Sequence, residues 1–293
     1  LPRFGSSDTG GREDASGVES DTVFKIGTTY HLDDDIMAFA LYSEGFRLGG
    51  HNNRRAANTG FVPLIFESDK VENVEIGLKS TLADGRLLLN VIAFQVEWED
   101  IQINRSGVDG RWWLRGTLNA GKGQNRGFEL DARWQATSNL YIYGNGSFGN
   151  PQYKGDNTNA FVTIPDGTPM VWAFKEKLSL GFEYTIPEVF GGYAWLGYNY
   201  SFEGSKWNTL SNAIDRDPEG VVPSWNLSNV HAGIATDSGW TYQLTIRNVF
   251  DQLGLNSLSN DSSGELFGDA RFNNIRNYAR PRTIGLKVTK RFE

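Results

Sequence analysis

Cysteine and long apolar segments are both missing from this chain. None of its 293 residues is cysteine, and it has three histidines and two methionines. Without cysteine there is no disulfide framework, no thiolate zinc site and no cysteine nucleophile. The longest uninterrupted apolar run, 36–42, is seven residues long, whereas a membrane-spanning helix needs about 20. The sequence therefore excludes a helical membrane protein. The lack of cysteine is compatible with an oxidising cell envelope.

Basic residues are also scarce. Lys and Arg number 28 against 35 Asp and Glu, so the net charge is −7. This balance argues against a nucleic-acid partner, because phosphate binding requires a basic surface. The segment that starts at Leu1 lacks the apolar core of a secretory signal peptide. We therefore expect either a mature product or a chain whose true N-terminus lies elsewhere.

Glycine (34 residues) and aromatic residues (13%) are abundant, and apolar residues alternate with polar ones. Between Trp172 and Ile186, for example, all even-numbered residues except Glu176 are apolar. Such a period of two predicts β-strands. A change of phase between Leu227 and Val230 predicts a β-bulge. We expect eleven strands, at 22–30, 35–48, 70–82, 86–104, 112–137, 139–149, 172–186, 192–204, 223–236, 239–251 and 280–292.

The connections between these strands alternate in length. Short turns rich in Gly, Asp and Pro alternate with long loops, so the two kinds of connection lie at opposite rims. This arrangement is typical of outer-membrane barrels. The short turns are 31–34, 83–85, 138, 187–191 and 237–238, and the long loops are 49–69, 105–111, 150–171, 205–222 and 252–279.

A soluble β-sandwich would also alternate, with its apolar faces packed together. Three features favour lipid instead: strands of 12 residues or more, strict alternation of turns and loops, and aromatic residues at strand ends. Residues 88–98 would rise roughly 25 Å at a tilt near 40°, the height of the apolar band. The predicted aromatic girdle consists of Tyr30, Trp98, Trp134, Trp172, Tyr184, Trp240 and Phe292.

Eleven is an odd number of strands. A closed up-and-down barrel pairs its first and last strands antiparallel, which requires an even count. An open edge in lipid leaves backbone groups unpaired, at several kcal/mol each. We therefore expect an all-β, antiparallel, incomplete barrel. Eleven is half of 22, the strand count of plugged outer-membrane transporters.

Four segments carry a family resemblance. They are Tyr42-Ser-Glu-Gly-Phe-Arg-Leu-Gly-Gly50; Val74-Glu-Ile-Gly-Leu-Lys-Ser80 with 90–102; 119–121 with 125–130; and 244–251 with the closing 280–292. In this order and spacing, they make the chain resemble the C-terminal half of the barrel of TonB-dependent outer-membrane receptors. The resemblance implies a 22-stranded barrel, an N-terminal plug, a TonB box and TonB as partner. Residues 1–293 would then be the C-terminal part of the barrel domain, without the plug and the first strands. Glu293 after Phe292 departs from the family's usual aromatic ending, and Lys290 replaces a more usual apolar residue.

Catalytic and metal-binding patterns are weak. His31, His51 and His231 lie far apart in the sequence, without metal-ligand spacing. The run Asp33–Asp35 lacks the glycine and glutamate spacing of an EF-hand, which indicates a solvated turn. We expect no enzyme activity, no metal and no cofactor. A surface enzyme would need a nucleophile such as Ser43 near a histidine.

Charged residues in the polar phase of the strands form the second set of candidates. Unpaired burial would cost several kcal/mol for each, so they must face water or a polar partner such as the plug. They form either a solvated wall or a conduit or plug-release contact. The set is Glu75, Lys79, Glu97, Glu99, Glu129, Asp131, Arg133, Lys175, Lys177, Glu183, Arg247 and Lys287.

Arginine and aromatic residues in the long loops form the third set. They could clamp an anionic, partly aromatic ligand such as a ferric siderophore, and tryptophan could also stack on a sugar. Alternatively, the tryptophans belong to the girdle and the arginines bind lipopolysaccharide phosphates. The set is His51, Arg54, Arg55, Trp112, Trp113, Arg115, Tyr153, Trp207, Arg216, Arg271 and Arg276.

The sequence thus predicts a receptor in the outer membrane of a Gram-negative bacterium, in contact with lipid and lipopolysaccharide. It would capture a scarce nutrient, a ferric siderophore above all, and import it with TonB-coupled energy. The alternatives are a passive channel or porin, and a glycan or cobalamin receptor of the same family.

Overall fold

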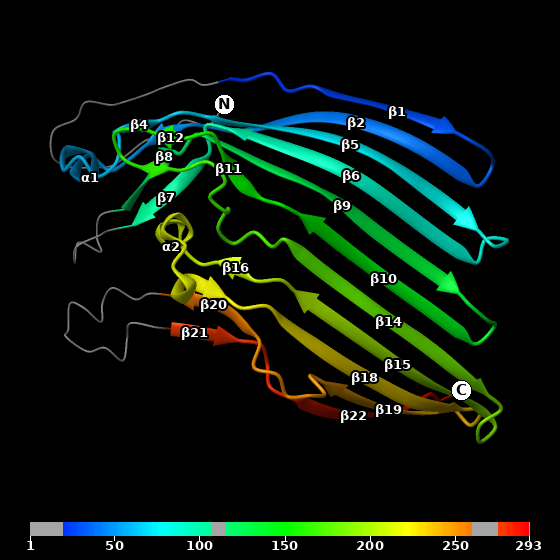
Figure 1. The fold of residues 1–293 in the computed structure, drawn as a ribbon. Helices are drawn as coiled ribbons and strands as arrows, with labels where there is room; N and C mark the ends of the chain where they lie inside the picture. The colour runs from blue at the N-terminus through cyan, green and yellow to red at the C-terminus, as the bar shows by residue number, and fades with distance from the viewer. Residues whose placement is uncertain (1–19, 107–114, 260–274, 293) are drawn as a thin grey trace.

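The computed structural model describes residues 20–106, 115–259 and 275–292. Eleven long strands form one sheet in which neighbours in the chain are neighbours in space (Figure 1), and each pair is antiparallel. This confirms the predicted up-and-down architecture. The strands are β1 (Lys25–His31), β2 (Ile36–Arg47), β5 (Asp69–Leu82), β6 (Leu87–Glu99), β9 (Lys122–Gln135), β10 (Leu140–Gly149), β14 (Glu176–Pro187), β15 (Gly192–Glu203), β18 (Trp225–Thr236), β19 (Trp240–Arg247) and β22 (Thr283–Lys290). A short twelfth strand, β11 (Gln152–Lys154), pairs with β9 outside this order.

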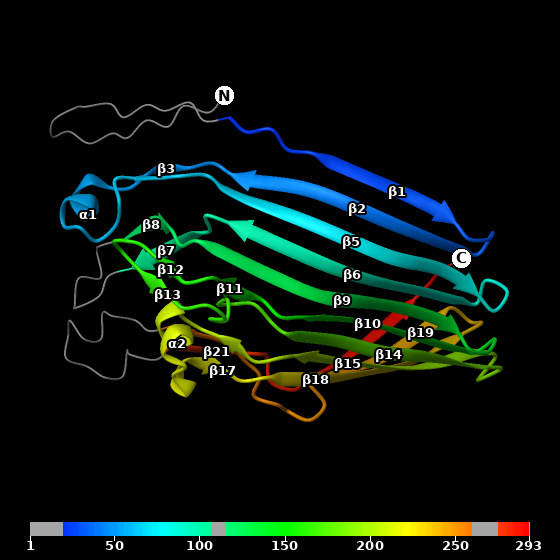
Figure 2. The same ribbon diagram turned by 45° about the horizontal axis from the view of Figure 1, so that its top comes forward.

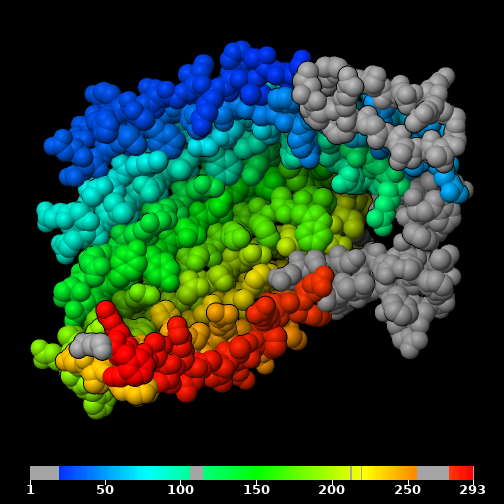
Figure 3. All heavy atoms as spheres, turned by 180° about the vertical axis from the view of Figure 1, so that it is seen from behind, coloured from blue at the N-terminus to red at the C-terminus, as the bar shows by residue number. Residues whose placement is uncertain are grey.

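The sheet is curved and open. β1 and β22 form its two edges and do not pair with each other in the described part of the chain. In Figure 2, β19 and β22 pass behind β10 and β14, so the sheet bends round instead of lying flat. The view from behind shows its hollowed side (Figure 3). The chain is therefore a partial barrel, as the odd number of strands predicted.

Short turns join the strands at one end of the sheet. Between β5 and β6, Ala83, Asp84 and Gly85 all have a positive φ (55°, 56° and 79°), as in a tight hairpin turn. Between β1 and β2, the carboxylate of Asp33 accepts hydrogen bonds from the backbone N–H groups of Asp35 and Ile36. Asp33 thus acts within a turn, where its side chain satisfies backbone donors.

The long loops gather at the other end and carry small elements of their own (Figure 1). None of the described helices is long and apolar enough to cross a membrane. The elements are β3 (Gly50–His51), α1 (Arg54–Asn58), β4 (Ile65–Phe66), β7 (Gln102–Ser106), β8 (Arg115–Asn119), β11 (Gln152–Lys154), β12 (Asn157–Thr158), β13 (Thr163–Ile164), β16 (Lys206–Trp207), α2 (Leu210–Asp215), η1 (Pro218–Gly220), β17 (Val221–Val222), β20 (Leu255–Ser259) and β21 (Ile275–Tyr278).

Two predicted strands are interrupted in the structure. The range 86–104 divides into β6 and β7 at Asp100, which has a φ of 52°, and 112–137 divides into β8 and β9 at Gly121, with a φ of 81°. The hairpin β7–β8 forms a separate two-stranded sheet. At both residues the backbone is left-handed, and the chain turns away from the sheet of eleven long strands at the same height. Alternation continues across such a break, so the pattern by itself did not reveal it.

The predicted bulge in 223–236 is wrong. β18 pairs with β15 in unbroken register from Trp225–Glu203 to Thr236–Gly192. The irregularity lies after β19, where Asn248 has a φ of 53° and the N–H of Val249 bonds to the carbonyl of Ser228. The Asn248 side chain holds this bend by donating to the carbonyls of Gln252 and Arg280.

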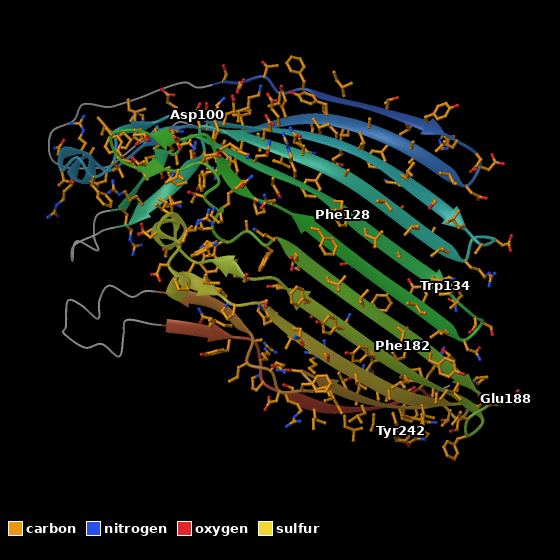
Figure 4. The ribbon with its side chains drawn as sticks, viewed as in Figure 1. Asp100, Phe128, Trp134, Phe182, Glu188 and Tyr242 are labelled. Atoms are coloured by element: carbon orange, nitrogen blue, oxygen red, sulfur yellow. The ribbon has the colours of Figure 1, made fainter. Side chains whose placement is uncertain are left out.

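The two faces of the sheet differ in polarity. One row of paired residues, Leu78–Val91–Leu130–Gly146–Leu178, is apolar, and the next row, Lys79–Asn90–Asp131–Asn145–Ser179, is polar. Phe128, Trp134, Phe182 and Tyr242 belong to the apolar face (Figure 4), with Phe128 50% exposed. No second sheet covers this face in the described chain, which excludes a sandwich. We call the apolar face the outer face and the hollowed polar face the inner face.

The predicted phase of β6 is wrong. Val91 lies in the apolar row with Leu78 and Leu130, so the odd-numbered residues of β6 point outward. Leu88 and Trp98 therefore point inward, and Trp98 is not a girdle residue. The reason is that, apart from Asn90, β6 is apolar on both faces between Leu87 and Phe94. A shift of one residue exchanges the faces of a strand, so alternation alone did not determine its phase.

Candidate ligand-binding site

The first three long loops share one apolar cluster. Its buried residues come from 48–68, 100–121 and 150–175, and the inward-pointing Trp98 packs beneath them. Loops that share a core hold one arrangement, since opening one of them exposes the others. The buried members are Ala56, Phe61, Val62, Ile101, Leu118, Ala120, Tyr153 and Ile164. We call this assembly the loop body.

Arg105 ties the loop body together. Its guanidinium carbon lies 4.6 Å from the centroid of the Phe61 ring. Its Nη1 donates to the backbone carbonyls of Phe61 and Phe161, both at 3.0 Å. One cation from the second long loop thereby satisfies carbonyls in the first and third loops. The sequence analysis did not single out Arg105, because its partners are backbone atoms of distant loops.

Tyr153 was predicted as a loop residue that touches the ligand, and the structure contradicts this. Its side chain is 3% exposed within the loop body. Burial raises the pKa of its hydroxyl to about 12, because the phenolate would be poorly solvated there. Tyr153 stabilises the loop body and offers no surface to a ligand.

Four predicted ligand residues lie exposed on the first two loops. His51 is on β3, Arg54 and Arg55 are on α1, and Arg115 is on β8. Asn52 joins these loops, since its Nδ2 donates to the carbonyl of Thr117 at 2.6 Å. Trp112, Trp113 and Arg271 lie outside the described residues. Arg276 lies in β21, but the structure does not describe its side chain.

Trp207 and Arg216 lie on the fourth long loop, 204–224, and both bind the third loop. The carbonyl of Trp207 accepts from the N–H of Trp172 at 3.0 Å. Nη2 of Arg216 donates to the carbonyl of Gly167 at 2.9 Å. These contacts give a first-and-second-loop group and a third-and-fourth-loop group of ligand candidates, although Leu210 and Ile214 of the fourth loop also pack against the loop body.

Lys206 lies at the second group. Its residue is 8% exposed, and its Nζ lies 4.4 Å from the centroid of the Phe174 ring and 5.2 Å from that of Trp172. Burial lowers its pKa, and the ammonium of Lys177 lowers it further, whereas the carboxylate of Glu203 acts in the opposite direction. Trp172, predicted for the girdle, lies before β14 and outside the sheet, so its ring belongs to this cluster and not to a strand face.

Ten of the predicted charges of the polar phase lie along the inner face. The strand register places nine of them there, and Lys175 lies opposite Gly149 just before β14. His231, also on this face, reaches across Gly197 to Glu183, with 3.3 Å between Nε2 and the carboxylate. The nine are Glu75, Lys79, Glu129, Asp131, Arg133, Lys177, Glu183, Arg247 and Lys287.

Glu97 and Glu99 are the exceptions and lie on the outer face, at the long-loop end of β6. This follows from the corrected phase of the strand, in which they share a side with Val91. They pair with Arg126 at 3.9 Å and with Lys122 of β9. Neither lines the inner wall.

Four predicted girdle residues do point outward at the short-turn end. Tyr30, Trp134, Tyr184 and Trp240 share the phase of the apolar rows. Phe292, 84% exposed, follows the end of β22, and its part in a girdle stays a prediction.

Comparison with known proteins identifies the architecture. A family model described as "TonB dependent receptor-like, beta-barrel" matches residues 3–249. The chain belongs to this family. Barrels of TonB-dependent receptors are outer-membrane proteins of Gram-negative bacteria. A comparison with curated protein sequences found no match.

This TonB-dependent receptor barrel is similar to several solved structures. The ferric yersiniabactin uptake receptor FyuA from Yersinia pestis matches with a TM-score of 0.71 at 16% identity, over 94% of this chain and 38% of that one. The siderophore receptor PiuA from Acinetobacter baumannii gives 0.68 at 15% identity, over 98% and 38%. BauA, the ferric preacinetobactin receptor from the same organism, gives 0.64 at 20%, over 93% and 36%. These identities show the fold.

The barrel chain spans little more than a third of the length of these receptors. FyuA and BauA are described as receptors for ferric ligands and PiuA as a siderophore receptor, and the family is one of transport receptors rather than enzymes. In the described part of the chain, no three His, Asp or Glu side chains are grouped to hold a metal ion.

Proposed function

We propose that this chain forms part of an outer-membrane receptor that binds a ferric siderophore at its long-loop end. Import of the siderophore would draw energy from TonB through parts of the receptor outside this chain. The observation that carries the proposal is the loop body, a packed and charged cap held by Arg105 at one end of a partial barrel. The resemblance to FyuA, PiuA and BauA supports the same ligand class.

Each surface has a task in this proposal. The apolar outer face contacts hydrocarbon, and the aromatic residues at its short-turn end lie near the headgroups. The charged inner face contacts water and the plug domain, because unpaired charges are costly in any other surroundings. The exposed cations and rings of the long loops bind the ligand through charge-assisted hydrogen bonds and stacking.

Uptake of radioactive iron tests this function. The full-length receptor that contains this chain is expressed in a bacterium without its own siderophore receptors, with and without TonB. We expect saturable uptake of at least one ferric siderophore that depends on TonB. Equal uptake in both strains would indicate a passive channel. Saturable uptake of cobalamin or a glycan alone would indicate a different ligand class.

A further inference from the structure

A lysine with little exposure and no paired carboxylate lies where the third and fourth long loops meet. Lys206 is in β16, and only 8% of it is exposed. In the described chain its ammonium forms no ion pair within 4 Å and no side-chain hydrogen bond. It lies against the Phe174 and Trp172 rings, at 4.4 and 5.2 Å from their centroids. Two aromatic faces offset only part of the cost of taking an ammonium out of water.

The surroundings add more positive charge. Nζ of Lys177 lies 5.8 Å from the centroid of the same Phe174 ring, so the two ammonium groups lie within about 10 Å of each other. Glu203 is the carboxylate beside them, and it is engaged by Lys177 at 3.3 Å. Two cations therefore share one anion.

Another polar group in this corner lacks a partner. Trp225 lies directly across from Glu203 in the β15–β18 ladder. Its buried indole Nε1 has no hydrogen-bond acceptor within the described structure. A buried donor without an acceptor is uncommon in a folded protein and calls for an explanation. Like the Lys206 ammonium, it would be satisfied by an electron-rich oxygen.

One ring beside the lysine is accessible. Trp172 is 45% exposed, whereas Phe174 is half-buried. The register β14–β15 places Lys177 and Glu203 on the inner face at the long-loop end. The corner thus combines a lysine that is only 8% exposed, a second cation and an exposed indole ring at the long-loop end of the partial barrel.

We propose that Lys206, Lys177 and Trp172 form a subsite for an anionic aromatic group of the ligand, such as a catecholate ring of a ferric chelate. The phenolate oxygens accept charge-assisted hydrogen bonds from the two ammonium groups, while the ring stacks on the Trp172 indole. A neutral hydroxamate chelate supplies neither the charge nor the ring. This inference rests on the proposed function, since it specifies the chemistry of the ligand.

Binding of two ferric chelates to the full-length receptor tests the subsite. The probes are a ferric tricatecholate, with three negative charges, and a neutral ferric trihydroxamate. We expect Lys206→Met to weaken tricatecholate binding about 10- to 100-fold, which is the typical worth of one charge-assisted hydrogen bond. Lys206→Arg should retain most of the affinity. Lys154→Met, a lysine of the neighbouring loop, is the matched control and should leave it unchanged.

Two exposed-residue variants protect the test against misfolding. Trp172→Leu and Lys177→Gln should each lower the tricatecholate affinity severalfold, while each variant reaches the outer membrane at the wild-type level. The subsite would be overturned if the variants lost affinity equally for both chelates. It would also be overturned if none of them lost affinity for the tricatecholate.

The outcomes for the wild-type receptor separate the two proposals. Binding of the trihydroxamate but not of the tricatecholate would preserve the proposed function and refute the subsite. Binding of neither chelate would refute the subsite, and the absence of saturable uptake for every ferric siderophore tested would refute the proposed function as well.

Discussion

Arg47 and Asp69 close the last rung of the β2–β5 ladder, where the first long loop leaves the sheet. The Asp69 residue is 2% exposed, and its carboxylate accepts from Nε of Arg47 at 2.9 and 3.0 Å. It also accepts from the N–H of Gln102, in the second loop, at 3.1 Å. The guanidinium lies over the Trp98 ring, 4.8 Å from its centroid. One buried carboxylate thus joins the wall to two loops.

We predict that Asp69→Asn loosens the first two long loops. The asparagine amide carries no negative charge, so the Arg47 guanidinium and the Gln102 N–H lose their charged acceptor. We expect this to lower the stability of the two loops by about 2 kcal/mol. Amide hydrogen exchange should accelerate in 48–68 and 100–106, with the eleven long strands unchanged. Asp84→Asn, in the short turn at the opposite end, is the matched control. Unchanged exchange in the loops of Asp69→Asn would contradict the assigned role.

Tyr153 should make the stability of the loop body depend on pH. Its pKa is raised from 10.0 to about 12 in the folded chain. Below pH 10 the phenol is neutral in both states, so the stabilisation is fully present. As the pH rises from 10 to 12, the unfolded state ionises first, and about 2 to 3 kcal/mol is lost.

Unfolding in guanidinium, followed by tryptophan fluorescence at pH 9 and pH 12, measures this loss. Tyr153→Phe is the control, because it keeps the ring and removes the ionisation. Between pH 9 and pH 12, this variant should lose about 2 to 3 kcal/mol less of its free energy of unfolding than the unaltered chain. Its ligand affinity at pH 7 should be unchanged. A large loss of affinity in Tyr153→Phe would restore Tyr153 as a ligand contact.

Adjacent residues of β14 should respond in opposite ways to an introduced lysine. Leu178 lies in the apolar outer row and Ser179 in the polar inner row. Lys at 178 would place an ammonium on the lipid side, which costs about 2 to 4 kcal/mol at the midplane of the bilayer and about 1 kcal/mol or less near its interfaces. Leu178→Lys should therefore fold into vesicles less stably, and Ser179→Lys should change little. Equal effects would be inconsistent with a lipid-facing outer row.

The corrected phase of β6 can be tested by chemical labelling, because the chain contains no cysteine that would compete. Val91 points outward and Ile92 inward. We expect a lipid-soluble maleimide to label Val91→Cys preferentially, and a charged, water-soluble maleimide to label Ile92→Cys. The reverse pattern would support the phase first predicted from alternation.

Much of the fold could be predicted from local patterns. The short turns were found from Gly, Asp and Pro, and the strands between them from alternation. The prediction failed where a segment was apolar on both sides, as in β6, or where a single left-handed residue, Asp100 or Gly121, redirected a strand. For the site, the predicted charges on the other strands share the inner face, because a residue's phase within its strand follows from its neighbours in sequence, and their contact with water or the plug stays a prediction.

Sequence alone therefore determined the repeated strand, the alternation of turns and loops and the incomplete barrel. The strands follow from the two-residue period of an extended backbone. The incomplete barrel follows from their odd number, because a closed up-and-down barrel needs an even count. Tertiary structure decided which side of β6 points outward and that Tyr153 is buried. It also decided that Arg105 joins three long loops and that Lys206 lies against the Phe174 and Trp172 rings. These depend on contacts between loops far apart in the chain. Packing then determines which side chains are covered and which remain available to a ligand.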